Sequence, residues 1–120
     1  MKYNRAKMLS LLQHLLTLIM SYNVIAWATL VYYCKKYPDV KEHLVDWFKT
    51  VENAKWKSFN ELKQDFPSCS LVGDDRVVFN IKGKTYRLIV RFSFAYKRVM
   101  VKFFGTHAEY DKVDAKTIEF

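Results

Sequence analysis

The sequence predicts an α+β fold in which N-terminal helices pack on one face of a small antiparallel sheet and a short C-terminal helix follows it. Two patterns of hydrophobic spacing support this prediction. Apolar residues recur every three or four positions in the first half of the chain, which is typical of helices. From Arg76 to Phe104 they alternate with polar residues, which is typical of half-buried strands. With 120 residues, of which 51% are hydrophobic, the chain is long enough for one domain with one core.

Residues 1–21 are predicted to form an apolar helical extension before the domain at residues 22–120. Their apolar residues follow the i, i+3, i+4, i+7 spacing of an amphipathic helix. No Lys, Arg, Asp or Glu occurs between Met8 and Cys34, so a membrane span and a signal peptide are alternatives. Polar residues within this run and basic residues at both flanks argue against both alternatives. A mis-assigned upstream start, with translation beginning at Met20, is the interpretation that we prefer.

A short strand and three helices are expected before Pro67. The strand covers residues 23–26, and the first helix ends before Pro38 because proline cannot continue a helix. The apolar face of the first helix carries Trp27, Leu30, Val31 and Cys34, and that of the second carries Val40, Leu44, Trp47, Phe48 and Val51. Ser58 and Glu61 match a capping box, in which each side chain satisfies one backbone N–H at the start of a helix. This capping box is expected to open the third helix.

Three strands follow, and each is expected to turn one apolar face towards the helices. The inward residues are Val77, Phe79 and Ile81 in the first strand, Tyr86, Leu88, Val90 and Phe92 in the second, and Val99, Val101 and Phe103 in the third. Residues 82–84 predict a tight hairpin, in which Gly83 can adopt a positive φ. Arg87, Arg91, Arg98 and Lys102 fall on the opposite faces. The sheet is therefore expected to be covered by helices on one side and basic on the other.

The net charge of +8 is concentrated in the predicted sheet. The segment from Asp74 to Phe104 contains eight Lys and Arg residues but only two Asp residues. A basic domain of this kind attracts nucleic acid, an anionic membrane or an acidic protein. After the last strand, Thr106 and Glu109 form a second capping box, which places His107 in the first turn of a short helix. The N-terminus of a helix attracts anions, so a phosphate is expected to lie close to His107.

The sequence contains no pattern typical of a metal or cofactor site. Cys34 and Cys69 lack the C-x-x-C spacing of zinc or redox sites, and no cluster of carboxylates resembles a two-metal site. We therefore expect no metal and no cofactor. Two reduced thiols are expected, which is typical of a cytoplasmic protein.

Several stretches resemble HigB-type toxins of the RelE superfamily. These stretches are KYPD at 36–39, WF at 47–48, WKSFNELKQDFPS at 56–68, RVVFNI at 76–81, YRLIV at 86–90 and GTHAEYDKVD at 105–114. The resemblance covers about residues 22–120, and the first 21 residues depart from the pattern. It implies a RelE-like fold and a ribosome-associated mRNA endonuclease. It also implies a HigA-type helix-turn-helix antitoxin that holds the toxin inactive.

The resemblance most directly supports four catalytic residues: Arg87, Lys102, His107 and Tyr110. Arg87 would clamp the scissile phosphate, because a guanidinium can bind two phosphate oxygens at once, and Lys102 would share the charge stabilisation. His107 would act as general acid or base, since an imidazole gains and loses a proton near neutral pH. Tyr110 would stack on a base or pass a proton.

Three further cations, Arg91, Lys97 and Arg98, are expected to hold the backbone of mRNA or ribosomal RNA. Alternatively, they form a basic rim that meets an acidic segment of the antitoxin. Two rival functions stay open at the level of sequence. One is a toxin of RelE/ParE fold that acts on a protein target such as DNA gyrase without cleaving RNA. The other is a non-enzymatic, membrane-anchored basic binding module, although a membrane partner is not expected.

Overall fold

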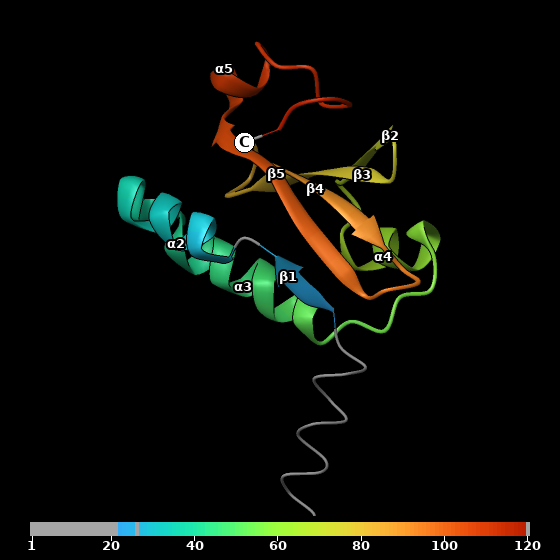
Figure 1. Ribbon diagram of the computed structural model, residues 1–120. Helices are drawn as coiled ribbons and strands as arrows, with labels where there is room; N and C mark the ends of the chain where they lie inside the picture. Colours follow the sequence, from blue (N-terminus) through green and yellow to red (C-terminus); the bar gives the residue numbers. More distant parts are fainter. Residues whose placement is uncertain (1–21, 26, 120) are drawn as a thin grey trace, which may run out of the picture.

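The structure, a computed structural model, describes residues 22–25 and 27–119. The predicted extension at residues 1–21, with the alternative start at Met20, lies outside the described residues, as does Ala26 at the end of the predicted first strand. The elements are β1 (Asn23–Ile25), α2 (Trp27–Lys36), the 3-10 helix η1 (Pro38–Val40), α3 (Lys41–Glu52), α4 (Phe59–Asp65), β2 (Ser70–Gly73), β3 (Arg76–Ile81), β4 (Tyr86–Ser93), β5 (Arg98–Thr106) and α5 (His107–Tyr110) (Figure 1). The fold class is α+β, as the sequence predicts.

The strands form one five-stranded sheet in the order β1-β5-β4-β3-β2. The pairs β2–β3, β3–β4 and β4–β5 are antiparallel, whereas β1 runs parallel to β5. The strand predictions at 76–81, 86–92 and 98–104 are confirmed as β3, β4 and β5. The sequence analysis missed β2, whose residues do not alternate between buried and exposed. The loop between β3 and β4 has four residues, 82–85, one more than predicted, and Gly83 adopts the expected positive φ of 63°.

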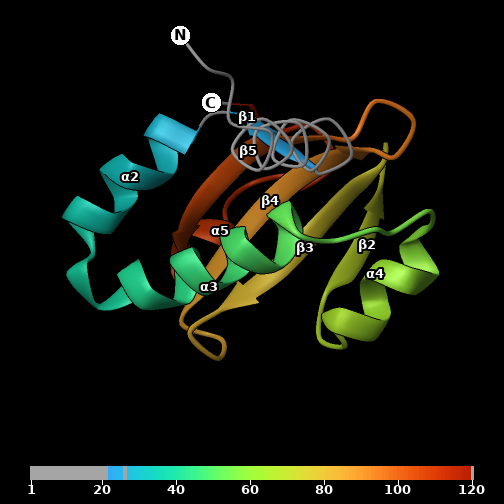
Figure 2. The same ribbon diagram turned by 90° about the horizontal axis from the view of Figure 1, so that it is seen from below.

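The helices α3 and α4 lie across one face of the sheet, and α2 lies beside its β1 edge (Figure 2). The core between helices and sheet is rich in aromatic rings, and Phe79 lies at its centre. The ring of Phe79 contacts those of Trp47 and Phe66 edge to face, with centroids 5.5 and 4.8 Å apart. Leu44 and Val51 of α3 are fully buried in the same core, and Phe48 is partly buried against it. The apolar face of α3 therefore packs into the core, as its spacing predicts.

The start of α4 differs in one detail from the predicted capping box. The Ser58 hydroxyl accepts a hydrogen bond from the Glu61 N–H, as expected. The Glu61 carboxylate, however, accepts from the backbone N–H of Lys57 and not from that of Ser58. Both side chains still satisfy a backbone donor, so the helix begins where the sequence predicts.

A β-bulge in β5 overturns one predicted orientation. Val101 pairs with Val90 but Phe103 pairs with Ile89, so Lys102 is an extra residue on β5. An extra residue reverses the alternation of side chains beyond it. As a result Phe104, and not Phe103, is buried among the core residues, where its ring stacks on Tyr86 at a centroid distance of 5.5 Å. The prediction that Phe103 faces the core was wrong for this reason.

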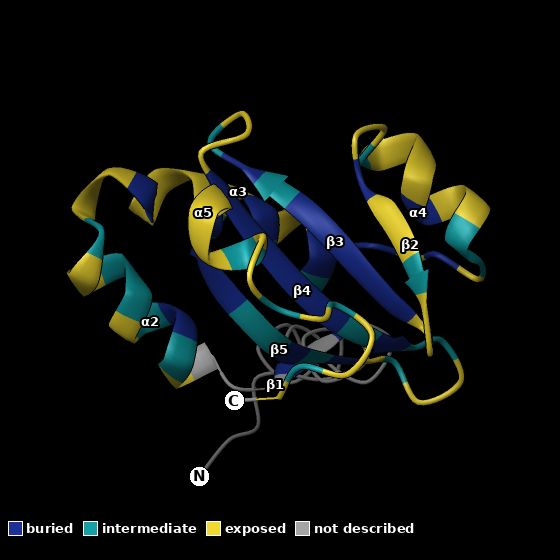
Figure 3. Ribbon diagram, turned by 90° about the horizontal axis from the view of Figure 1, so that it is seen from above, coloured by how far each residue is buried: buried dark blue, intermediate teal, exposed yellow. Residues whose placement is uncertain are grey.

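The opposite face of the sheet carries basic residues, but it is not fully exposed to solvent. The segment 111–119 after α5 runs back across β4 and β5 on the side away from α3 (Figure 3). On this face Ile89 is completely buried and Val78 almost completely, although the face was expected to be uncovered. Arg76 anchors this segment, because its guanidinium donates to the Ile118 carbonyl at 2.6 Å. Both faces of the sheet are therefore covered, one by helices and the other by this segment.

Replacing Phe79 with alanine should destabilise the protein by about 3–5 kcal/mol. The substitution leaves a cavity in the core and removes the ring contacts with Trp47, Phe66 and Phe92. The free energy of unfolding can be measured by urea titration followed by circular dichroism. Tyr96→Ala is the control, since this ring is 74% exposed and its loss should change stability by no more than about 0.5 kcal/mol. A cost below about 1 kcal/mol for Phe79→Ala would contradict this description of the core.

Candidate active site

The short helix α5 is fixed by a complete capping box. The Thr106 hydroxyl accepts from the Glu109 N–H at 3.2 Å, and the Glu109 carboxylate accepts from the Thr106 N–H at 3.1 Å. This backbone hydrogen bond lowers the pKa of Glu109 below its usual value. The Tyr37 hydroxyl also donates to Glu109 at 3.2 Å, which joins α5 to the segment after α2. The predicted cap is confirmed, and it holds a helix too short to be stable alone.

His107 lies in the first turn of α5, where the sequence places it. Its Nδ1 lies 3.0 Å from the Asp111 carboxylate one turn later. A carboxylate at Nδ1 fixes the orientation of an imidazole and directs Nε2 outward. Both side chains are about half exposed, so a ligand from solvent can reach the ring. The geometry suits proton transfer at Nε2.

Arg87 lies in β4 next to α5 and is only 9% exposed. Its guanidinium donates to the Lys84 carbonyl at 2.8 Å and lies 5.7 Å from the ring centroid of Tyr110. Gly105, the partner of Arg87 on β5, leaves room for the ring of Phe103 against its backbone. A Cβ at Gly105 would lie 2.8 Å from the ring of Phe103, so a larger residue would displace its surroundings. The sheet thus presents a positioned cation directly beside the aromatic ring of α5.

Lys102 lies on the same sheet face, but an acidic residue already binds it. Its Nζ donates to the Glu119 carboxylate at 2.8 Å, and the second oxygen of that carboxylate accepts from Arg76 at 2.7 Å. The hydrogen bond from Lys102 is the main reason that the pKa of Glu119 lies below its usual value. Lys102 lies on the face that alternation along β5 predicts, and the β-bulge brings Phe103 to the same face.

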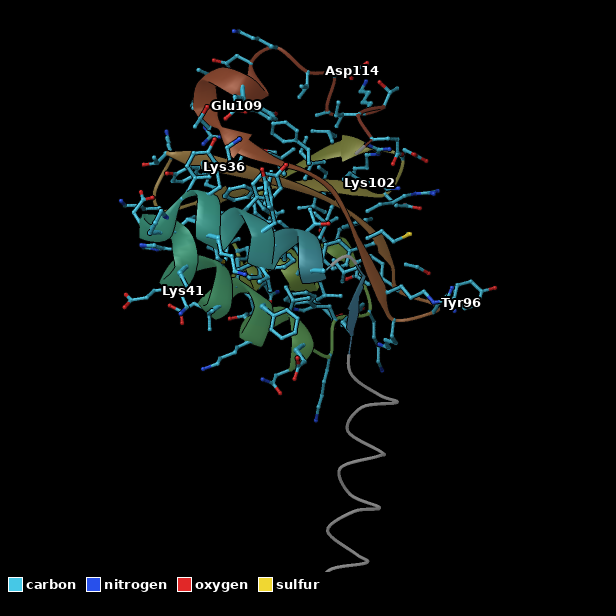
Figure 4. All side chains as sticks on the ribbon, turned by 60° about the vertical axis from the view of Figure 1, so that its left-hand side comes forward. Lys36, Lys41, Tyr96, Lys102, Glu109 and Asp114 are labelled. Carbon is cyan, nitrogen blue, oxygen red and sulfur yellow. The ribbon has the colours of Figure 1, made fainter. Side chains whose placement is uncertain are left out.

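The three expected RNA-binding cations lie towards the other end of β4 and β5. Arg91 pairs with Asp74 at 3.3 Å, and Arg98 stacks on Tyr96 with 5.5 Å between guanidinium and ring centroid. Lys97 lies over the ring of Tyr22, 5.0 Å from its centroid. Figure 4 shows Tyr96 projecting at the end of the molecule opposite Glu109. The structure therefore groups Arg87, His107 and Tyr110 at α5, and it separates them from the residues at 97 and 98.

The sequence analysis gave no role to Tyr37 and Asp39, which hold the two sides of this site together. Asp39 accepts from Lys82 at 2.8 Å and from the Tyr86 hydroxyl at 3.0 Å, while Tyr37 donates to Glu109. The first contact fixes the β3–β4 loop, whose Lys84 carbonyl binds Arg87. The only sequence signal was that residues 36–39 belong to the stretches that resemble the toxin family.

The group at α5 contains a guanidinium, an imidazole and a phenol, which can bind an anion and move a proton. Among residues 22–25 and 27–119, no three His, Cys, Asp or Glu side chains come together as metal ligands would. Over the same residues, no helix is long and apolar enough to cross a membrane.

The helix-covered sheet with a basic site at α5 is the architecture expected of RelE-like toxins. The family model of HigB toxins, described as the RelE-like toxic component of a toxin-antitoxin system, matches residues 40–113. The chain therefore belongs to the HigB toxin family, and membership implies an antitoxin partner. The matched range contains Arg87, Lys102, His107 and Tyr110. Comparison with curated proteins gave no significant match.

Replacing Asp39 with asparagine should destabilise the protein in a pH-dependent way. The hydrogen bond from Lys82 lowers the pKa of Asp39 from its ordinary 3.8, so the carboxylate stabilises the fold above that pH. This contribution is lost as the pH falls through the lowered pKa. We therefore expect Asp39→Asn to lower the melting temperature at pH 7, with a smaller difference from wild type at pH 3.

The matched control is Asp46→Asn, which makes the same change at an exposed residue of α3 and should leave the melting temperature unchanged at either pH. If Asp39→Asn lowered the melting temperature equally at pH 7 and pH 3, the charge of the Asp39 carboxylate would not be the source of the stabilisation.

Proposed function

We propose that this HigB-family protein is an mRNA interferase, a ribosome-associated endonuclease that cleaves mRNA without a metal ion. The observation that carries the proposal is the grouping of Arg87, His107 and Tyr110. A buried strand positions the Arg87 guanidinium next to the Tyr110 ring of α5, and the first turn of the same capped helix carries the half-exposed imidazole of His107. RNA cleavage by its own ribose needs a group that binds the scissile phosphate and a group that moves protons. This site offers both.

In the proposed reaction, the ribose 2′-oxygen attacks the adjacent phosphorus while the bond from phosphorus to the 5′-oxygen breaks. A base takes the proton of the 2′-hydroxyl, and an acid gives a proton to the leaving 5′-oxygen, so the products are a 2′,3′-cyclic phosphate and a 5′-hydroxyl. His107 performs one of these two proton transfers through Nε2. Arg87 stabilises the charge that develops on the phosphate oxygens, and Lys102, which the sequence indicated for the same task, binds the RNA backbone further along β5. Tyr110 stacks on a base or performs the other transfer.

The proposed partners follow from the charge distribution and the family. Arg91, Lys97 and Arg98 would bind the backbone of mRNA or ribosomal RNA at the end of the sheet away from α5, as positively charged side chains do. The antitoxin would be of the HigA type, with a helix-turn-helix fold. Because mRNA and ribosomes are the targets, the proposed location is the cytoplasm.

Replacing His107 with alanine should abolish growth arrest and reduce RNA cleavage at least about 100-fold, because a general acid or base contributes about that much. Arg87→Ala should cause a similar loss. Arg87→Lys should restore only part of the activity, since an ammonium cannot bind two phosphate oxygens in one plane. Mapping of new 5′ ends on mRNA after induction in a bacterial host measures the effect.

The matched control is His43→Ala, because His43 is an exposed histidine that belongs to α3 and has no role in the proposed reaction. It should cleave mRNA as the wild type does, and all variants should still bind the antitoxin. New 5′ ends at wild-type frequency in His107→Ala would remove this residue from the catalytic set. Growth arrest by the wild type without any new 5′ ends would favour a toxin that acts on a protein target such as DNA gyrase.

A further inference from the structure

The carboxylate of Glu119 bridges two cations on the sheet face that carries the proposed active site. One oxygen accepts from Arg76 at 2.7 Å and the other from Lys102 at 2.8 Å. Glu119 is itself 57% exposed, whereas Arg76 is 3% exposed and Lys102 is 18% exposed. The anion of this cluster is therefore at the surface, and the cations are fixed beneath it.

Arg76 needs an anion at this position. Its guanidinium also donates to the carbonyls of Ala115 and Ile118, but among residues 22–25 and 27–119 only Glu119 and Asp74 bring negative charge to it. The Asp74 carboxylate is the weaker partner, because its oxygen lies 3.8 Å from Nε. This buried Nε has no hydrogen-bond partner among the described residues. A buried cation without its partner strongly destabilises the folded protein. The Glu119 carboxylate can therefore move away from Arg76 only if another anion takes its place.

A phosphate group is a suitable replacement. It offers several acceptor oxygens at once, and a guanidinium beside an ammonium is a common arrangement for binding it. Lys102 precedes Gly105, the partner of Arg87, by three residues, which is about 10 Å along a strand. An RNA strand that lies along β5 with its scissile phosphate at Arg87 would therefore pass close to this cluster.

We propose that Arg76 and Lys102 form a phosphate-binding site that Glu119 occupies in the free protein and a backbone phosphate of the RNA substrate occupies in the complex. The identity of the ligand rests on the proposed function. Glu119 then competes with the RNA phosphate for Arg76 and Lys102. The segment 111–119 therefore both covers the sheet and weakens RNA binding. Arg76 extends the RNA-binding surface beyond the residues that the sequence indicated.

Replacing Glu119 with glutamine should tighten RNA binding, because the amide keeps the shape of the side chain and loses the charge. The measurement is fluorescence anisotropy with a labelled 2′-O-methyl RNA oligonucleotide, which binds but lacks the attacking hydroxyl. We expect Glu119→Gln to bind roughly threefold to fivefold more tightly, the upper part of the range that a partly exposed ion pair supports. Glu42→Gln removes the same charge at an exposed residue of α3 and should change affinity less than about twofold.

A double-mutant cycle tests whether the effect passes through Lys102. In a Lys102→Met background, Glu119→Gln should tighten binding by clearly less, since one of the two cations is missing. Inorganic phosphate offers a second measurement: it should raise the melting temperature of Glu119→Gln more than that of the wild type. If Glu119→Gln folds poorly, Glu119→Asp shortens the side chain and should give an intermediate gain in affinity.

Equal RNA affinity of Glu119→Gln and Glu42→Gln would overturn the inference, and so would an undiminished effect of Glu119→Gln in the Lys102→Met background. The proposed function fails separately. If the wild type cleaves mRNA but Glu119→Gln does not change binding, the nuclease proposal stands and the phosphate site does not. If Glu119→Gln binds RNA more tightly but neither protein cleaves it, the phosphate site stands and the nuclease proposal does not.

Discussion

The sheet is covered on both faces, and this covering is the constraint on which the rest of the structure depends. The helices bury one face around Phe79, and the segment after α5 buries the other over Ile89. That segment is held by the buried guanidinium of Arg76. Because α5 lies between the end of β5 and this segment, it is fixed from both sides. The position of His107 therefore follows from how the second face of the sheet is closed.

The same arrangement separates the two chemical tasks of the proposed site. The cation, Arg87, is nearly buried and rigid, because a strand and the β3–β4 loop hold it. The titratable group, His107, is on the surface and oriented by a carboxylate. Tyr37 and Asp39 connect the two parts, since one binds α5 and the other binds the loop. These contacts keep the parts of the proposed site in place.

Local patterns predicted most of the fold and part of the site. Alternation located β3, β4 and β5, and the capping box located α5, because both patterns lie within a few residues. The bulge at Lys102 could not be predicted: Phe103 and Phe104 are adjacent and equally apolar, so neither residue shows which one faces the core. The contacts of Asp39 and Tyr37 join residues 43 to 72 positions apart, and no local pattern reports them. The resemblance to HigB toxins, not the spacing, supplied the catalytic roles.

The chemical nature of the cleaved ends tests the central claim most directly, because attack by the ribose 2′-hydroxyl leaves a defined product. Ribosome-bound mRNA would be incubated with the purified protein in a buffer containing a metal chelator, with and without a single 2′-deoxynucleotide at the mapped cut. The account predicts a 5′-hydroxyl and a 2′,3′-cyclic phosphate, and no cleavage after the deoxynucleotide. A 5′-phosphate with a 3′-hydroxyl, or cleavage after the deoxynucleotide, would contradict it.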